Sequence, residues 1–196
     1  MNAPSRVEAN ARLTGLSGIV VLVLLIAELV TVVLGARGAL SLHVAIGLIL
    51  VPPVLVKLTS TTWRMVNYYL RAPAYTRRGP PATADRVLGP FLSLAVVVLL
   101  VSGLALLLGP SSVHRIALPV HKVSFYLALL LIAAHLPRHL LQAVRLAASD
   151  RMNRGGTALM VRARWMTILG SVLLGAMLAL VLAGHAEPYT HHYYSR

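Results

Sequence analysis

Residues 40–71, LSLHVAIGLILVPPVLVKLTSTTWRMVNYYLR, decide the fold expected for this chain. The stretch begins as an apolar helix that carries His43, and it ends in aromatic and cationic side chains. This order is typical of a helix leaving a bilayer, because aromatic rings favour the headgroup level and cations the water beyond. Gly47 follows His43 by one turn and has no side chain, so a flat ligand could lie below the imidazole. Pro52 and Pro53 predict a bend, since neither donates a backbone hydrogen bond.

The composition of the whole chain predicts an integral membrane protein. Of 196 residues, 58% are hydrophobic and only 12% are charged, which is too apolar for a soluble domain of this size. The formal net charge of +13 does not indicate nucleic-acid binding, because the cations lie between apolar runs. The absence of cysteine excludes disulfides, iron–sulfur clusters and thiolate ligation. The eight histidines are therefore the main candidates for metal ligands.

The apolar runs predict an all-α fold, a bundle of five membrane-spanning helices. We place the spans at about 15–36, 40–58, 88–109, 119–142 and 165–184, after an N-terminal segment 1–14 and before a tail 185–196. The first run lacks a small-residue cleavage site and predicts a retained helix rather than a signal peptide. We expect a short link at Arg37 and Gly38 and a polar loop over 72–87.

The distribution of cations predicts the orientation in a bacterial cytoplasmic membrane. With five spans in this order, fourteen of the eighteen Lys and Arg residues fall on the side of the amino terminus. Cytoplasmic loops of membrane proteins carry an excess of Lys and Arg. The amino terminus is therefore expected in the cytoplasm and the carboxyl-terminal tail outside.

Two histidines are expected at one depth of the bundle. His43 lies near the outer end of the second span and His121 near the outer end of the fourth, and both spans run inward. Two histidines from different helices at one level are what bis-imidazole ligation of a b-type haem requires. Arg37, Arg115 and Lys122 are the cations available for the haem propionates. We predict a four-helix haem-binding core made of the second to fourth spans with the first or fifth.

A second group of residues lies deeper in the fourth span. His135 and His139 follow His121 by 14 and 18 residues, which places them on nearly the same helix face. His135 is about 21 Å farther along the axis, too far to share an iron with the first pair. Together with Lys57, and with Glu28 of the first span as a possible further member, they form a candidate second site for a quinone or another cofactor. The alternative is that both are interfacial histidines beside Arg138.

Glu28 is a lone carboxylate in the second half of the first span. At that depth it should be protonated, paired or turned into the bundle, because an ionised carboxylate in lipid is costly. It is a candidate for polarising a ligand or relaying a proton, and a carboxyl merely tolerated by packing is the alternative. A small transporter that uses Glu28 and the histidine face is one rival function. A non-haem membrane anchor or scaffold is the other.

The remaining histidines offer weaker patterns. His185, His191 and His192 lie in the tail, where no regular element sets their spacing, so we expect a solvated tail rather than a metal site. His114 lies in the link before the fourth span and has no partner that the sequence reveals.

Several stretches resemble a known group of membrane proteins. They are LHVAIGLILVPPVLVKLTSTTWRMVNYYL, AYTRRGPP, LGPFLSLAVVVLLVSGLALLLGP and VHKVSFYLALLLIAAHLPRHL, which together cover about residues 40–142. They are similar to small actinobacterial proteins related to bacterial cytochrome b-561 and to the membrane part associated with sulfite-oxidase-type molybdopterin oxidoreductases. More distantly, they resemble ferric-reductase-like proteins and nickel-hydrogenase b-cytochrome subunits.

The resemblance implies a haem b electron-transfer subunit rather than a complete enzyme. It assigns haem ligation to His43 and His121, and it matches His135 and His139 to a recurrent pair near the end of the fourth helix. The second helix has Lys57 where a di-haem pattern has another histidine, so one haem is expected. Electrons would pass between the quinone pool and a redox partner chain, such as a molybdopterin oxidoreductase.

Overall fold

The chain folds into helices that are long enough to cross a bilayer. A computed structural model describes residues 6–77, 83–151 and 158–186, and this part of the chain contains no strand. Its elements are α1 (Arg6–Val33), α2 (Ala36–Tyr69), α3 (Pro73–Thr76), α4 (Thr83–Leu108), α5 (Ser111–Arg151), α6 (Ala158–Leu182) and the short 3-10 helix η1 (Ala183–Ala186). Within these ranges, five helices are long and apolar enough to span a membrane: α1, α2, α4, α5 and α6. The protein is therefore all-helical and a multi-pass membrane protein.

The turn between α1 and α2 lies slightly earlier than the sequence predicts. Gly35 adopts a φ of 91° immediately before α2, a conformation that costs glycine little and other residues more. The predicted link at Arg37 and Gly38 instead belongs to the first turn of α2. Since a left-handed residue ends a helix efficiently, Gly35 is the physical reason for the earlier turn.

The second helix continues through its two prolines. α2 runs without interruption over 34 residues, and Pro52 and Pro53 are both buried inside it. Beyond them, Trp63 is 58% exposed and its indole N–H donates a hydrogen bond of 3.1 Å to the hydroxyl of Tyr75 in α3. This aromatic contact lies where the sequence predicts the headgroup level. Residues 78–82 of the predicted loop lie outside the described part of the chain.

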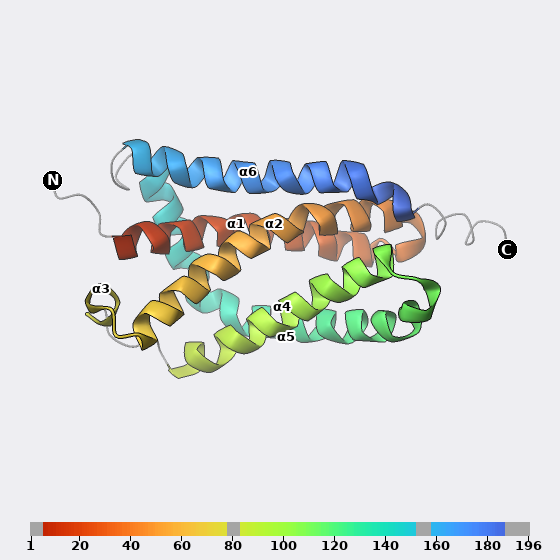
Figure 1. Ribbon diagram of the computed structural model, residues 1–196, viewed down its shortest axis with the longest axis horizontal. Coiled ribbons are helices and arrows are strands. Elements are labelled where there is room, and N and C mark those ends of the chain that lie inside the picture. Colours follow the sequence, from red (N-terminus) through yellow and green to blue (C-terminus); the bar gives the residue numbers. More distant parts are fainter. Residues whose placement is uncertain (1–5, 78–82, 152–157, 187–196) are drawn as a thin grey trace.

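The helices form one bundle with α1 and α2 at its centre (Figure 1). α1 packs on α2 and α5, α6 packs on the opposite side of α2, and α4 packs mainly on α5. Val21, Leu50 and Val54 form a buried apolar cluster between α1 and α2. At Gly175 the backbone of α6 approaches α2 so closely that an added Cβ would lie 2.4 Å from the carbonyl oxygen of Ile49. Such small-residue contacts are typical of helix packing in membranes.

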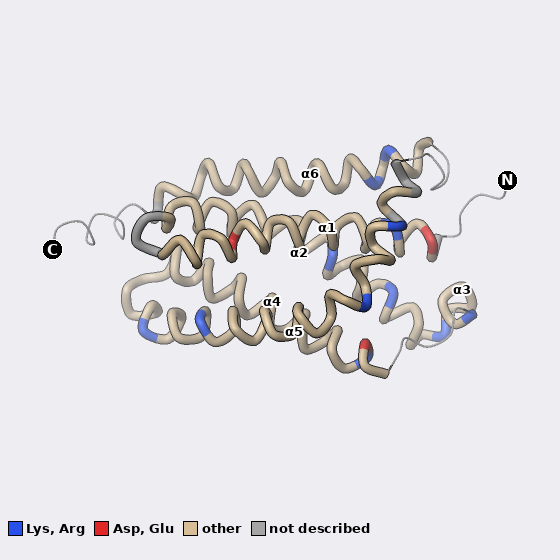
Figure 2. The backbone as a smooth tube through the Cα atoms, turned by 180° about the vertical axis from the view of Figure 1, so that it is seen from behind, with Lys and Arg blue, Asp and Glu red and all other residues tan. Residues whose placement is uncertain are grey.

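The surface of the bundle is apolar along its length and basic at one end. Many large apolar side chains point outward, among them Leu180 with 85% exposure and Ile116 with 71%. Lipid would cover such a surface, because water would not stabilise so much exposed hydrocarbon. The Lys and Arg residues gather toward the end where the amino terminus lies, and few lie at the other end (Figure 2). The fold thus has the charge asymmetry expected of a protein oriented in a bilayer.

Candidate functional site

His43 of α2 and His121 of α5 meet inside the bundle. Their ring centroids are 6.3 Å apart and their planes are nearly perpendicular, at 84°. In the described part of the chain, the principal neighbours of α2 are α1 and α6, and those of α5 are α1 and α4. The two imidazoles therefore meet between helices that are not close packing partners. We call His43 and His121 the histidine pair.

Two residues of α1 hold the ring of His43. Its Nδ1 lies 2.6 Å from Oε2 of Glu28 and 3.0 Å from the hydroxyl of Thr31. Both α1 side chains are buried, with exposures of 8% for Glu28 and 2% for Thr31. An added Cβ at Gly47 would lie 2.9 Å from Oε1 of Glu28, so the missing side chain at this position makes room for the carboxyl. A carboxylate that accepts the Nδ1 proton leaves Nε2 of His43 with its lone pair.

Residues of α4 hold the ring of His121. Its Nδ1 lies 3.0 Å from the backbone carbonyl oxygen of Leu99 and 3.2 Å from the hydroxyl of Ser102. A carbonyl oxygen can only accept, so Nδ1 must carry the proton and Nε2 carries the lone pair. An added Cβ at Gly103 would lie 3.1 Å from Cε1 of His121. Gly103 therefore lets α4 lie close against the imidazole.

The separation of the two rings matches that of two imidazoles that share one metal ion. Each Nδ1 has a hydrogen-bond partner, whereas Nε2 of neither ring has a hydrogen bond to any described residue. With a metal–nitrogen bond of about 2.0 Å and a ring centre about 1.1 Å beyond it, two opposed imidazoles have centroids roughly 6 Å apart. The observed 6.3 Å fits this separation.

The predicted propionate partners are placed only in part. Arg115 and Lys122 are exposed on α5, six residues before His121 and directly after it. The side chain of Arg37 lies outside the described part of the structure. Both cations are thus near His121 in sequence, and both side chains are exposed.

A second cluster lies near the amino-terminal end of α4. Rings of His135 and His139 stack at a centroid distance of 4.2 Å, and Nε2 of His139 lies 3.2 Å from Oδ1 of Asp85. Arg138 contributes a weaker contact, at 3.8 Å from the same carboxylate. Lys57 of α2 lies within electrostatic range of His135. We call Asp85, His135 and His139 the Asp–His cluster.

The structure divides the predicted second site. Lys57, His135 and His139 come near one another, but Glu28 lies with the histidine pair instead. The sequence misses Asp85, because the residue falls in a segment expected to be a loop. The sequence offers one weak signal for this residue. Asp85 is an acidic residue directly before Arg86, and in the structure it lies in the first turn of α4.

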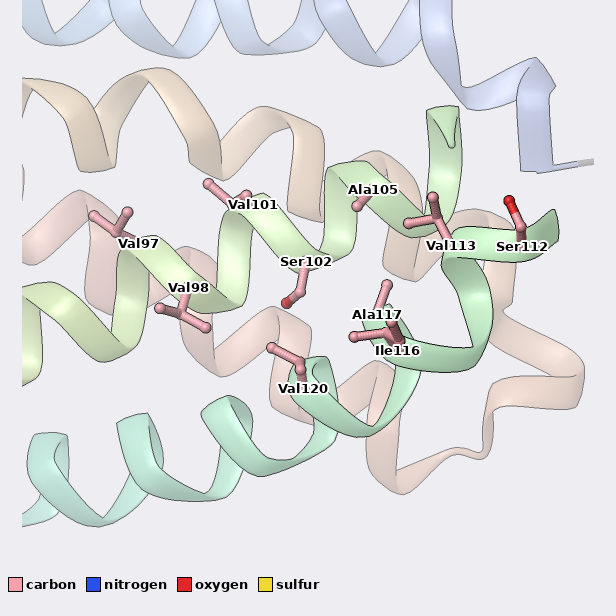
Figure 3. A pocket seen from close by; sticks show the side chains of 10 residues that line it. All are labelled: Val97, Val98, Val101, Ser102, Ala105, Ser112, Val113, Ile116, Ala117 and Val120. Atoms are coloured by element: carbon pink, nitrogen blue, oxygen red, sulfur yellow. The ribbon is translucent and has the colours of Figure 1, made fainter. Parts of the chain in front are cut away.

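An apolar groove of about 510 Å³ lies between α4 and the first turns of α5 (Figure 3). Val98, Ile116 and Val120 are among the side chains that line it, and Ser102 is one of its few polar residues. Neither member of the histidine pair lines the groove. We interpret it as a part of the lipid-facing surface.

No family model, curated protein or solved structure matches this chain. Its function must therefore be inferred from the histidine pair and the Asp–His cluster. A further described histidine, His114, lies at the α4–α5 turn. Its Nε2 is 3.2 Å from the carbonyl oxygen of Gly109. His191 and His192 lie outside the described residues, and so does the side chain of His185.

Proposed function

We propose that this protein is a membrane b-type cytochrome that binds one haem b between Nε2 of His43 and Nε2 of His121. The observation that carries the proposal is the histidine pair itself, with centroids 6.3 Å apart and both Nδ1 atoms engaged by other groups. Metal-bound histidines almost always have such a partner on the second nitrogen.

The protein would position the haem and tune its redox potential, and its own side chains would not react. Glu28 and Thr31 fix the ring of His43, and the Leu99 carbonyl and Ser102 fix that of His121. Haem b would supply reversible one-electron chemistry at its iron. Because the two rings are held by different helices, α1 and α4, their orientation depends on the packing of the whole bundle.

The proposed orientation of the protein in the membrane follows from the distribution of charged residues. The end rich in Lys and Arg would face the cytoplasm, so the histidine pair would lie near the outer face. Arg37, Arg115 and Lys122 would then neutralise the propionates there. We propose electron exchange between the quinone pool, with Lys57 as a candidate quinone contact, and a redox partner chain such as a molybdopterin oxidoreductase.

An absorption spectrum of the purified protein tests the proposal. We expect sharp reduced-minus-oxidised Soret and α bands of haem b, and a pyridine haemochrome assay should give one haem per chain. A protein purified with its helical circular dichroism intact but without these bands would refute the cytochrome proposal. Proton or solute flux in liposomes, lost on Glu28→Gln, would then support the transporter, and absence of flux the membrane anchor.

A further inference from the structure

We propose that Asp85, His135 and His139 form a separate binding site for a divalent transition metal ion, with Zn²⁺ as the best match. One ligand atom from each of the three residues lies within 4.8 Å of the others. His135 and His139 are four residues apart on α5, a spacing that places two imidazoles on one helix face and is used by helical zinc sites. Asp85 adds a carboxylate from α4.

The geometry needs little adjustment to hold an ion. Two ligands of a tetrahedral Zn²⁺ lie about 3.3 Å apart, from metal–ligand bonds of about 2.0 Å. Nε2 of His139 and Oδ1 of Asp85 are already 3.2 Å apart, and the two imidazoles stack at 4.2 Å. Rotation of the His135 ring is the principal movement required. Three protein ligands leave one position open for water or another ligand.

A second observation points independently to a missing ligand partner. Nδ1 of His135 is buried and has no hydrogen-bond partner among the residues that the structure describes. Buried polar atoms are nearly always satisfied, and one that is not calls for an explanation such as an ion or a water molecule. A metal ion bound by this ring would satisfy Nδ1 directly, or would fix the orientation of the ring through its other nitrogen.

The ligand atoms determine which ion the site prefers, and the surrounding charges determine how strongly the ion binds. Imidazole nitrogens favour Zn²⁺ over Mg²⁺ or Ca²⁺, which prefer sites made of oxygen ligands alone. Lys57 and Arg138 oppose a cation, so binding should be weaker than in a site without them. The guanidinium of Arg138 is 52% exposed and can turn into water, whereas the Lys57 ammonium lies against Gly18 of α1.

The site would join the two helices of the α4–α5 hairpin at their open end. The turn at Gly109 and Pro110 connects these helices at the other end, where the histidine pair lies nearer. A metal ion shared by Asp85 and the two α5 histidines would therefore hold the first turn of α4 against α5. This role does not depend on haem binding.

Metal binding to the full-length protein tests this proposal. The background carries alanine at the three tail histidines, His185, His191 and His192, so that they cannot compete. Titration with Zn²⁺, and with Co²⁺ as a coloured probe, should show one ion per chain. Asp85→Asn, His135→Ala and His139→Ala should each weaken binding by about ten-fold or more. The matched control is His114→Ala, another α5 histidine, which should leave binding unchanged.

Asp85→Asn keeps the size and a hydrogen-bond acceptor, so lost binding in this variant cannot be ascribed to lost packing. The proposal is overturned if the background protein binds no ion, or if binding survives in all three cluster variants. Zn²⁺ binding should also persist in His43→Ala, which separates this site from the histidine pair. Loss of binding in His43→Ala, with intact helical circular dichroism, would contradict a separate site.

Discussion

The histidine pair lies on α2 and α5, whereas the Asp–His cluster lies on α4, with Asp85, and on α5, with its two histidines. The two sites occupy two levels of the bundle and are built differently. His43 and Lys57 are 14 residues apart in α2, and His121 and His135 are 14 residues apart in α5, which is about 21 Å in each helix. At the first level each helix supplies one imidazole. At the second, α5 supplies two imidazoles and α2 a lysine.

This difference shows that the depth of a histidine in the bundle does not by itself decide what a site can bind. At the first level, partners from α1 and α4 hold both Nδ1 atoms and leave two Nε2 atoms for one ion. At the second, the histidines share one helix and stack on each other, so they cannot lie on opposite faces of a porphyrin. The first level is suited to axial ligation, and the second to a small ion.

The largest expected effect is at the ligands. His43→Ala and His121→Ala should each abolish haem retention, because a single axial imidazole does not replace the pair. His135→Ala, at the other level of α5, should retain the full haem content. Pyridine haemochrome assays on the purified variants measure this. Haem lost only from His135→Ala or His139→Ala would reverse the assignment of the two levels.

A smaller effect is expected at the carboxyl that holds His43. Glu28→Gln keeps the shape of the side chain but removes the anionic acceptor at Nδ1. We expect haem affinity to fall by about 10- to 100-fold and the midpoint potential to rise, because the imidazole becomes a weaker donor to the iron. Redox titration and haem-transfer assays measure both. Asp85→Asn is the matched control at the other level, and an equal change in that variant would refute a specific role for Glu28.

The next effect concerns the fit of α4 against His121. Gly103→Ala adds a methyl group about 3.1 Å from Cε1 of a ring that two hydrogen bonds hold in place. The ring can yield only by stretching them, so we expect haem affinity to fall several-fold, or about 1 kcal/mol. Equilibrium haem binding to the apo-protein is the readout. Unchanged affinity would show that the ring is not held tightly.

The smallest effect is expected at Gly18, the equivalent contact at the other level. An added Cβ would lie 3.0 Å from Nζ of Lys57, the far end of a flexible side chain. Gly18→Ala should change haem affinity by less than about 0.5 kcal/mol, and alanine should favour the helix. Haem titration and thermal unfolding in detergent test this. A loss as large as that of Gly103→Ala would mean that the two levels are equally rigid.

The class of fold could be predicted from the sequence, because apolar runs of membrane length have few alternatives. The meeting of His43 and His121 could also be anticipated, since two helices that run in one direction place equal depths side by side. The helix ends could not be predicted: Gly35 sets the turn before α2, and α5 continues to Arg151, well beyond the apolar run. Polar residues at a membrane surface carry little information about where a helix stops.

The hydrogen-bond partners of the histidines could not be predicted from the sequence. The spacing within α1 does not reveal that Glu28 lies against Gly47 and His43, because this depends on how α1 rotates against α2. The Leu99 carbonyl has no side-chain signature at all. Asp85 could be found only once α4 was known to begin at Thr83. Contacts between helices, unlike helices themselves, are set by packing that a single sequence does not display.

Low-temperature electron paramagnetic resonance of the oxidised protein tests the central claim most directly. Two axial imidazoles with nearly perpendicular planes, at 84°, predict a strongly anisotropic low-spin ferric signal from one haem per chain. The signal should vanish in both His43→Ala and His121→Ala. A high-spin signal in the unaltered protein, or a low-spin signal that survives either substitution, would contradict ligation by this pair.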